Sequence, residues 1–182
     1  MGRVQELVYL VRHGESEWNV RGVTQGQTAH PRLTARGREQ MVTAAERIRC
    51  LTSGRKVGLV TSSDLDRAVE GAEILSQLLG AGRSEDIRLR ERSFGLFQGT
   101  KHARTLAWTA RASKLALAHG GVEDAGRVRL RAQVALAGLA SGTTHVVVGH
   151  GEFFRLLPGG ADLGVVGNGD VVVWDGASVR RT

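Results

Sequence analysis

The chain has 182 residues, enough for one domain with a substantial core, so we expect a single domain over residues 1–182. A hydrophobic content of 41% with 24% charged residues excludes a disordered chain, and no apolar run is long enough to cross a membrane. The net charge of +7 makes nucleic-acid binding a possibility to consider. Aromatic residues, however, make up only 4% of the chain, and the arginines are scattered along it. We therefore predict neither a nucleic-acid nor a membrane partner.

The one cysteine, Cys50, leaves no intramolecular disulfide framework and no cysteine metal motif. The first apolar run is too short for a signal peptide and leads directly into a candidate catalytic motif. These features predict a cytoplasmic protein. The sequence does not predict an oligomeric state.

Short runs rich in Val, Leu and Ile predict the strands. They cover about residues 5–11, 57–61, 87–90, 144–149 and 170–174. Strands that alternate with helices are typical of an α/β fold. We therefore expect a three-layer sandwich in which helices flank a mostly parallel central sheet.

Helical patterns lie between these strands. Thr34 is the expected N-cap of a helix over 35–51, and Ser63 or Asp64 is the expected N-cap of the next. The other helical segments are 101–118, 123–140 and a short one, 152–157, that must stop at Pro158.

Arg12 and His13 directly follow the apolar run 7–11, which indicates that they lie where a buried strand ends. Ligands of open α/β sheets bind at that edge. A cation next to a potential nucleophile predicts an anionic substrate, phosphate first. His-Gly-Glu occurs again at 150–152 after another apolar run, so two strands could bring two histidines together.

Five segments, in order, resemble the signature motifs of the histidine phosphatase superfamily, which includes the cofactor-dependent phosphoglycerate mutases. They are Arg12–Asn19, Gln25-Gly26 with Leu33-Thr34 and Gly37, Ser62–Ala68, Leu89–Gly95 and Val146–Gly151. The resemblance covers nearly the whole chain. It implies phosphoryl transfer through a phosphohistidine.

The resemblance makes His13 the nucleophile, since an imidazole nitrogen can attack phosphorus. It makes Arg12 and Arg67 phosphate clamps, a role that suits the planar, permanently charged guanidinium. His150 would hydrogen-bond the phosphoryl group, and Glu91 would be the general acid. An ordinary core or surface position remains the alternative for each of these side chains.

Glu91 stands among Arg88, Arg90 and Arg92 in the sequence, and these neighbours should favour its charged form. An exposed ion pair is therefore a real alternative for this carboxylate. The family positions that contact the substrate are matched by Asn19, Gln25, Gly26 and Gly151. Asn19 could equally be a cap or turn residue.

His13, His150 and Glu91 could in principle hold zinc. The sequence lacks local ligand spacing such as HExxH, and two nearby arginines would oppose a cation. We therefore predict no metal and no cofactor.

Mutases of this family carry a longer segment after the acidic motif, with basic residues that grip a bisphosphorylated acid. Here only residues 92–119 separate Glu91 from Gly120, and the paired arginines are absent. This departure favours water as the phosphoryl acceptor. The predicted function is a metal-independent phosphomonoesterase for a small phosphorylated substrate, selected mainly by residues 98–125. A phosphoglycerate mutase and a non-catalytic phospholigand-binding module are the alternatives.

Overall fold

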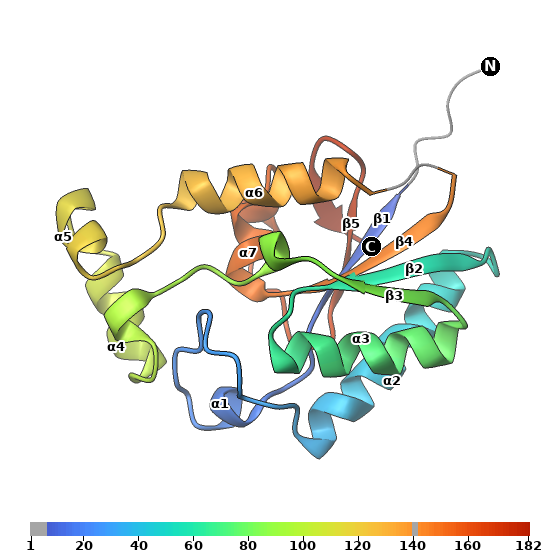
Figure 1. The fold of residues 1–182 in the computed structure, drawn as a ribbon, viewed down its shortest axis with the longest axis horizontal. Coiled ribbons are helices and arrows are strands. Elements are labelled where there is room, and N and C mark those ends of the chain that lie inside the picture. Colours follow the sequence, from blue (N-terminus) through green and yellow to red (C-terminus); the bar gives the residue numbers. More distant parts are fainter. Residues whose placement is uncertain (1–6, 140–141) are drawn as a thin grey trace.

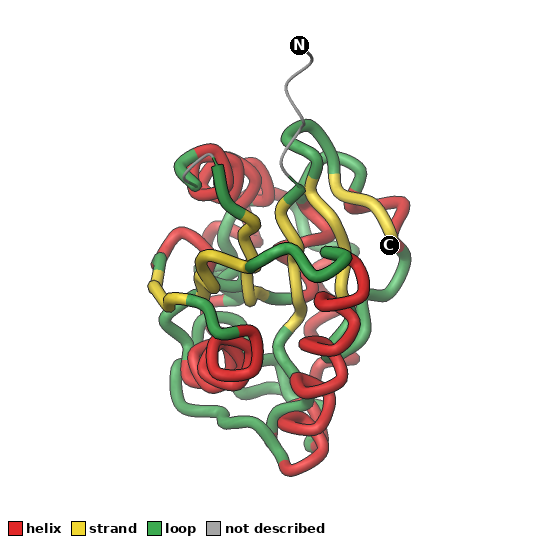
Figure 2. Tube along the Cα trace, turned by 90° about the vertical axis from the view of Figure 1, so that its right-hand side faces the viewer, coloured by secondary structure: helices red, strands yellow, loops and turns green. Residues whose placement is uncertain are grey.

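The computed structural model describes residues 7–139 and 142–182. In this part of the chain, helices pack on both faces of a six-stranded sheet with the order β3-β2-β4-β1-β5-β6 (Figures 1 and 2). The strands are β1 (Val8–Arg12), β2 (Val57–Ser62), β3 (Gly82–Glu85), β4 (Thr144–Gly149), β5 (Val171–Trp174) and β6 (Val179–Arg181). The first four are parallel, whereas β5 is antiparallel to β1 and to β6. The expected α/β sandwich with a mostly parallel sheet is confirmed.

Seven α-helices connect or cover these strands within the described residues. They are α1 (Glu17–Val20), α2 (Ala35–Leu51), α3 (Asp66–Leu79), α4 (His102–Thr109), α5 (Lys114–His119), α6 (Ala125–Ala137) and α7 (Gly151–Leu156). Helices α2 and α3 cover one face of the sheet, and α6 and α7 cover the other (Figure 1). None of these helices is long and apolar enough to cross a membrane.

The core is split by the sheet into two layers. Tyr9 and Val11 of β1 pack with α2 and α3, whereas Val8 and Leu10 pack with α6 and α7. This alternation follows from the two-residue period of a strand. Each fully buried Val or Leu stabilises the fold by roughly 1.5–3 kcal/mol. The central strands are therefore rigid supports for whatever their carboxyl ends carry.

Most predicted strands are confirmed, but the one at 87–90 is wrong. Ile87–Leu89 forms a 3-10 turn, in which the Asp86 carboxylate accepts a hydrogen bond from the backbone N–H of Arg88. The edge strand lies earlier, at β3. Residues 5–6 and 140 of the predicted elements lie outside the described residues, and the single domain stays a prediction.

Thr34 caps α2 as predicted, because its hydroxyl accepts from the N–H of Gly37 at 3.0 Å. The predicted capping of α3 by Ser63 or Asp64 is wrong, since Leu65 occupies that position without a side-chain bond. The segment 101–118 is two helices, and Ser113 caps the second. Helix α7 ends before Pro158, as expected.

Candidate active site

The carboxyl ends of β1, β2 and β4 meet at one end of the sheet. His13 follows β1, Ser63 follows β2 and His150 follows β4. Because β4 lies between β1 and β2, the three side chains converge. The ring centroids of His13 and His150 are 5.2 Å apart, so the two strands bring the histidines together as expected.

His13 is buried, and its Nδ1 lies 2.7 Å from the carbonyl oxygen of Gly14. A carbonyl can only accept, so this contact assigns the proton to Nδ1 and leaves Nε2 unprotonated. Burial, followed by the charges of Arg67 and Arg12, holds the pKa of His13 well below its usual range. The ring is therefore neutral, with one nitrogen available as a nucleophile.

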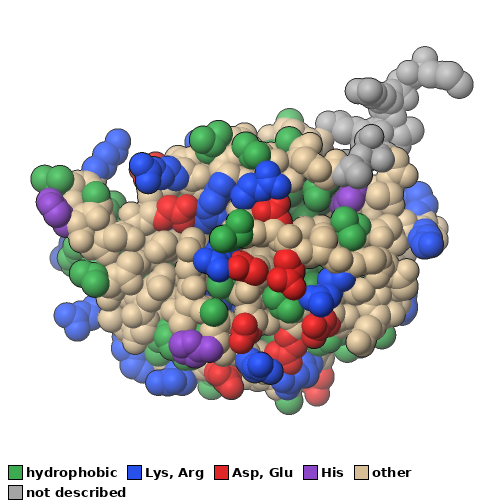
Figure 3. Space-filling view, in the orientation of Figure 1, with side chains coloured by type: hydrophobic (Ala, Val, Ile, Leu, Met, Phe, Trp, Pro, Cys, Tyr) green, Lys and Arg blue, Asp and Glu red, His purple; other side chains and the backbone are tan. Residues whose placement is uncertain are grey.

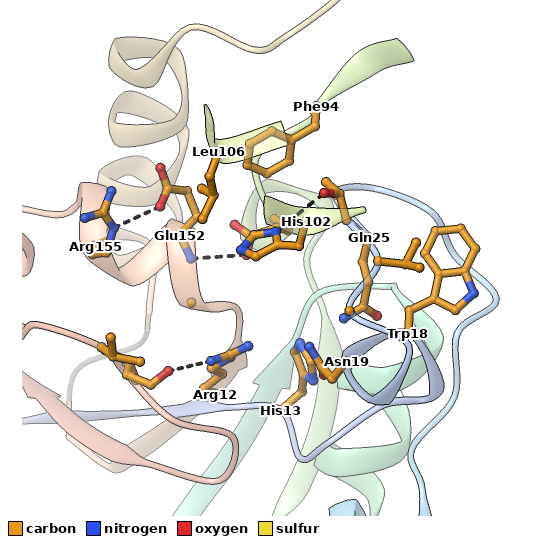
Figure 4. Close-up of a pocket in the computed structure, with 18 of the residues that line it drawn as sticks. Arg12, His13, Trp18, Asn19, Gln25, Phe94, His102, Leu106, Glu152 and Arg155 are labelled. Atoms are coloured by element: carbon orange, nitrogen blue, oxygen red, sulfur yellow. Dashed lines mark hydrogen bonds and ion pairs between the residues drawn. The ribbon is translucent and has the colours of Figure 1, made fainter. Parts of the chain in front are cut away.

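Arg67 is the largest fully buried side chain of the site, and it is fixed by backbone carbonyls. Its Nη1 donates to Thr28 at 2.9 Å and its Nη2 to Gly26 at 2.8 Å. Burial lowers the pKa of Arg67 to about 10, which still leaves it charged at neutral pH. Arg12 is held in a similar way, by a 2.6 Å bond from Nη1 to the carbonyl of Val166 (Figure 4).

Three buried nitrogens around His13 have no hydrogen-bond partner among the described residues: Arg12 Nε, Arg67 Nε and His150 Nδ1. Leaving one such group unpaired costs roughly 1–3 kcal/mol, so native proteins rarely do so. An arginine Nε always carries a hydrogen. Two charged guanidinium groups with unsatisfied donors create a site suited to an anion with several oxygen acceptors.

His150 is tied to Ser63, whose Oγ lies 2.7 Å from His150 Nε2. Burial, followed by the charge of Arg67, holds the pKa of His150 well below its usual range, so this ring is neutral as well. When the Ser63 hydroxyl donates to Nε2, the ring proton sits on Nδ1. That arrangement turns the unpartnered Nδ1 into a donor.

Glu91 lies at the N-terminus of α7. Its carboxylate oxygens accept from the backbone N–H groups of Arg92 at 2.8 Å, Glu152 at 3.1 Å and Phe153 at 2.9 Å. These donors favour the charged form, but burial is the larger effect and raises the pKa of Glu91. The carboxyl can therefore carry a proton at a higher pH than an exposed glutamate.

The expectation that Arg88, Arg90 and Arg92 keep Glu91 charged is wrong. Arg88 pairs with Asp86, Arg90 pairs with Asp64, and Arg92 reaches Glu152 at 3.5 Å. In an irregular segment, neighbours in sequence point in different directions. The guanidinium groups of the three arginines thus pair with other carboxylates, and the buried Glu91 carboxyl lines the pocket.

One cavity of about 570 Å³ collects the candidate residues (Figure 4). It is lined by Arg12, His13, Asn19, Gln25, Gly26, Arg67, Glu91 and Gly151, while His150 lies buried beside His13. No group of three or more His, Cys, Asp or Glu in residues 7–139 and 142–182 is placed to hold a metal ion. The absence of a metal stays a prediction.

Asn19 both caps and lines the pocket. Its Oδ1 accepts from the N–H of Ser16 at 3.0 Å, completing the N-terminal cap of α1. The Oε1 of Gln25 accepts from the Ser16 hydroxyl at 2.8 Å. Because the side-chain amide oxygens of Asn19 and Gln25 already accept hydrogen bonds within the protein, their amide nitrogens are the polar groups that these two side chains can offer to a ligand. A Cβ on Gly151 would lie 3.3 Å from Arg12 Nε, so this glycine gives the guanidinium room.

Sequence reasoning missed several pocket residues. From the segment expected to select the substrate, only His102 and Leu106 line the cavity. Val165 and Val166 also line it, although they lie far along the chain, before β5. Their loop reaches the pocket because β5 pairs with β1, and no local motif signals that neighbourhood.

A sequence model of the histidine phosphatase superfamily (branch 1) matches residues 8–164. A protein of Citrobacter koseri named probable phosphoglycerate mutase GpmB is 36% identical over an alignment of 154 residues that covers 79% of this chain and 69% of that protein. The protein of the same name from Salmonella paratyphi C is 44% identical over 91 residues, which cover 50% of this chain and 40% of that relative.

Solved structures agree with this assignment. A mycobacterial glucosyl-3-phosphoglycerate phosphatase in complex with VO3 has a TM-score of 0.76 and 29% identity, with 96% of each chain covered. The Bacillus stearothermophilus protein YhfR, at 23% identity, shares the fold with a TM-score of 0.77 over 97% of this chain and 95% of its own. With the family match spanning most of its length, the chain belongs to the histidine phosphatase superfamily.

Proposed function

We propose that this chain is a metal-independent phosphomonoester hydrolase that acts through a phosphohistidine at His13. The observation that carries the proposal is the set of unpartnered buried nitrogens of Arg12, Arg67 and His150 around a neutral histidine. A tetrahedral oxyanion has the charge and the acceptors that these nitrogens need. His13 would then lie beside the phosphorus with Nε2 unprotonated.

In the first half-reaction, Nε2 of His13 attacks phosphorus, and the bond from phosphorus to the ester oxygen breaks. Glu91 donates its proton to the departing alkoxide. In the second half-reaction, water attacks phosphorus, Glu91 takes a proton from that water, and the bond to Nε2 breaks. Arg12, Arg67 and His150 stabilise the charge on the three outer oxygens in both steps.

A phosphoglycerate mutase is the second candidate, because the relatives named for that activity are up to 44% identical in the matched region. Hydrolysis is favoured by the near-complete coverage of the mycobacterial phosphatase. The two activities share the first half-reaction and differ in the acceptor. A mutase must hold a phosphorylated acid for the return transfer, whereas a hydrolase admits water.

The test is hydrolysis of p-nitrophenyl phosphate near pH 6 in excess EDTA, with His13→Ala compared with the native chain. The matched control is His119→Ala, which removes the histidine of the last turn of α5, outside the pocket. We expect activity that resists EDTA, disappears in His13→Ala and persists in His119→Ala. Labelled substrate quenched in alkali should leave phosphate on the native chain and on His119→Ala but not on His13→Ala, because phosphohistidine survives alkali.

Other outcomes are equally informative. Activity lost to EDTA would point to a metal-dependent hydrolase. Isomerisation of phosphoglycerate faster than phosphate release would identify a mutase. Vanadate binding without turnover of any monoester would identify a phospholigand-binding module.

A further inference from the structure

The cavity extends well beyond the groups that would bind phosphate. Arg12, His13, Arg67 and Glu91 lie at one end, together with Gly26, Gly151 and Val166, which lie against the two arginines. We call the remaining lining residues the outer wall. A volume of about 570 Å³ is within the range of pockets that enclose a whole small organic molecule. The outer wall is therefore the part of the site that contacts the leaving group.

The outer wall combines apolar and polar side chains. The apolar ones are Trp18, Val23, Phe94, Leu106 and Val165, and the polar ones are Asn19, Thr24, Gln25, His102, Glu152 and Arg155. Leu106 is 50% exposed and Val165 is 83% exposed, although both border the cavity. Exposed apolar side chains from distant segments that gather at one concave site indicate an apolar ligand. Figure 4 shows Phe94 and Leu106 above His13 with His102 between them and His13, and Trp18 to the right beyond Gln25.

The charged groups of the outer wall neutralise one another. Arg155 Nε donates to the Glu152 carboxylate at 2.9 Å (Figure 4), and the other oxygen of Glu152 lies 3.5 Å from Arg92, which is outside the cavity lining. Arg155 is the one arginine or lysine that lines the described cavity outside the phosphate end. A carboxylate on the leaving group would have to give up water and compete with Glu152 for it.

His102 is a further polar side chain on this wall. Its Nδ1 lies 3.4 Å from the Thr24 hydroxyl, which bonds Thr105 at 2.7 Å. The Nδ1 side of the His102 ring is thus in contact with the hydroxyl groups of Thr24 and, through it, Thr105. Lys101 is turned away, because its Nζ donates to the carbonyl of Arg21.

We propose that the site selects monoesters with an apolar, preferably aromatic, leaving group over phosphorylated carboxylic acids. The inference rests on the proposed function and names its substrate class. Apolar contact improves binding roughly fourfold for each buried methylene equivalent, so a phenyl group should contribute a large factor. The relatives' names refer to phosphorylated acids, and the outer wall of this chain indicates a different preference.

The experiment compares 2-phenylethyl phosphate with 3-phosphoglycerate. Both are alkyl phosphates, so differences in leaving-group reactivity are small. We expect kcat/KM to be at least roughly tenfold higher for 2-phenylethyl phosphate. Leu106→Ala should lower kcat/KM for this ester severalfold, whereas competitive inhibition by orthophosphate, which occupies only the phosphate end, should not change.

Leu106→Arg supplies the unpaired cation that the outer wall lacks. It should lower kcat/KM for 2-phenylethyl phosphate and raise it for 3-phosphoglycerate, which narrows or reverses the ratio. Leu115→Arg is the matched control, since Leu115 is 68% exposed on α5 and does not line the cavity. A ratio that Leu106→Arg leaves at its native value would overturn the inference.

Binding separates this inference from the proposed reaction. The dissociation constants of both esters can be measured by calorimetry on His13→Ala, which should not turn them over. Equal or tighter binding of 3-phosphoglycerate would refute the apolar preference, whatever the native chain hydrolyses. Tighter binding of 2-phenylethyl phosphate, with no turnover of any ester by the native chain, would support the preference and reject the hydrolase.

Discussion

At the scale of single residues, Glu91 is the group whose protonation decides the chemistry. We expect Glu91→Gln to lower kcat/KM for 2-phenylethyl phosphate by roughly 10²–10⁴, because an alkoxide needs a proton to leave. p-Nitrophenyl phosphate should lose much less, since nitrophenolate leaves without one. The measurement is kcat/KM for both esters between pH 4 and 8.

The dependence of kcat/KM on pH is a second test of the role of Glu91. Native activity should fall in acid as His13 protonates, at a pH set by its lowered pKa. It should fall in alkali as Glu91 loses its proton, at a pH set by its raised pKa. The alkaline limb should disappear in Glu91→Gln. Glu39→Gln, at an exposed site on α2, is the control. An equal loss on both esters would instead indicate that the amide disturbs α7.

The sequence predicted where the reactive side chains meet but not their chemical state. Arg12, His13 and His150 follow apolar runs, and parallel strands place such residues at one edge of a sheet. The raised pKa of Glu91 depends on its burial at the N-terminus of α7. It also depends on the neighbouring arginine side chains, which pair with other carboxylates, as Arg90 does with Asp64. Neither is encoded within a few residues of Glu91.

At the scale of elements, the loop after β1 lies directly against the start of α2. A Cβ on Gly14 would overlap the carbonyl of Gly37, and a Cβ on Gly37 would overlap the carbonyl of Glu15. The N–H of Thr34 also donates to Glu15 at 2.9 Å. Two stretches of backbone are thus in contact, and α2 holds the turn that carries His13.

We therefore expect Gly37→Ala to lower the free energy of unfolding by about 1–3 kcal/mol, because neither backbone can yield easily. It should also lower kcat/KM, since a displaced Gly14 carbonyl no longer orients His13. Urea unfolding and phosphatase assays measure the two effects. Gly138→Ala is the control, because its Cβ would make ordinary contacts at the end of α6. A Gly37→Ala protein with native stability would show that the contact is loose.

The central strands of the sheet could be predicted from the sequence, whereas the edge strands β3 and β6 could not. Strands β1, β2 and β4 are largely buried between helices, so each contains a run of apolar residues that is visible in the sequence. Strand β3 reads Gly-Arg-Ser-Glu and β6 reads Val-Arg-Arg, because an edge strand is half solvated. The 3-10 turn at Ile87–Leu89 looked like a strand because Ile and Leu fit both structures.

At the scale of the whole molecule, charge is unevenly spread. Residues 98–122, which include α4 and α5, contain four Lys or Arg residues and no Asp or Glu. In Figure 3 acidic side chains gather over the middle and lower right of the face shown, and blue side chains stand along the lower left. A positive field on the side of α4 would draw anionic esters toward the pocket that α4 borders.

The two buried histidines also couple stability to pH. In the unfolded chain a histidine has a pKa near 6.5, whereas burial holds the pKa of His13 and His150 well below that value. Below about pH 6.5 the unfolded chain therefore binds more protons, and stability falls as the pH falls. Each histidine contributes up to about 1.4 kcal/mol per pH unit. Glu91 acts in the opposite sense, because its raised pKa lets the folded chain take up a proton first.

We expect the free energy of unfolding to drop by at most about 2.5 kcal/mol between pH 7 and pH 5.5, because each histidine can contribute about 1.2 kcal/mol over that range and Glu91 offsets part of it. Urea titrations without phosphate, with a constant slope against urea, measure the change. His13→Gln should remove about half of the histidine contribution, and His119→Gln should leave it intact. A midpoint independent of pH in Glu91→Gln, where the opposing glutamate is gone, would mean that the folded and unfolded chains bind equal numbers of protons. His13 and His150 would then keep ordinary pKa values, and near pH 6 most of His13 would have to lose a proton before it could attack phosphorus.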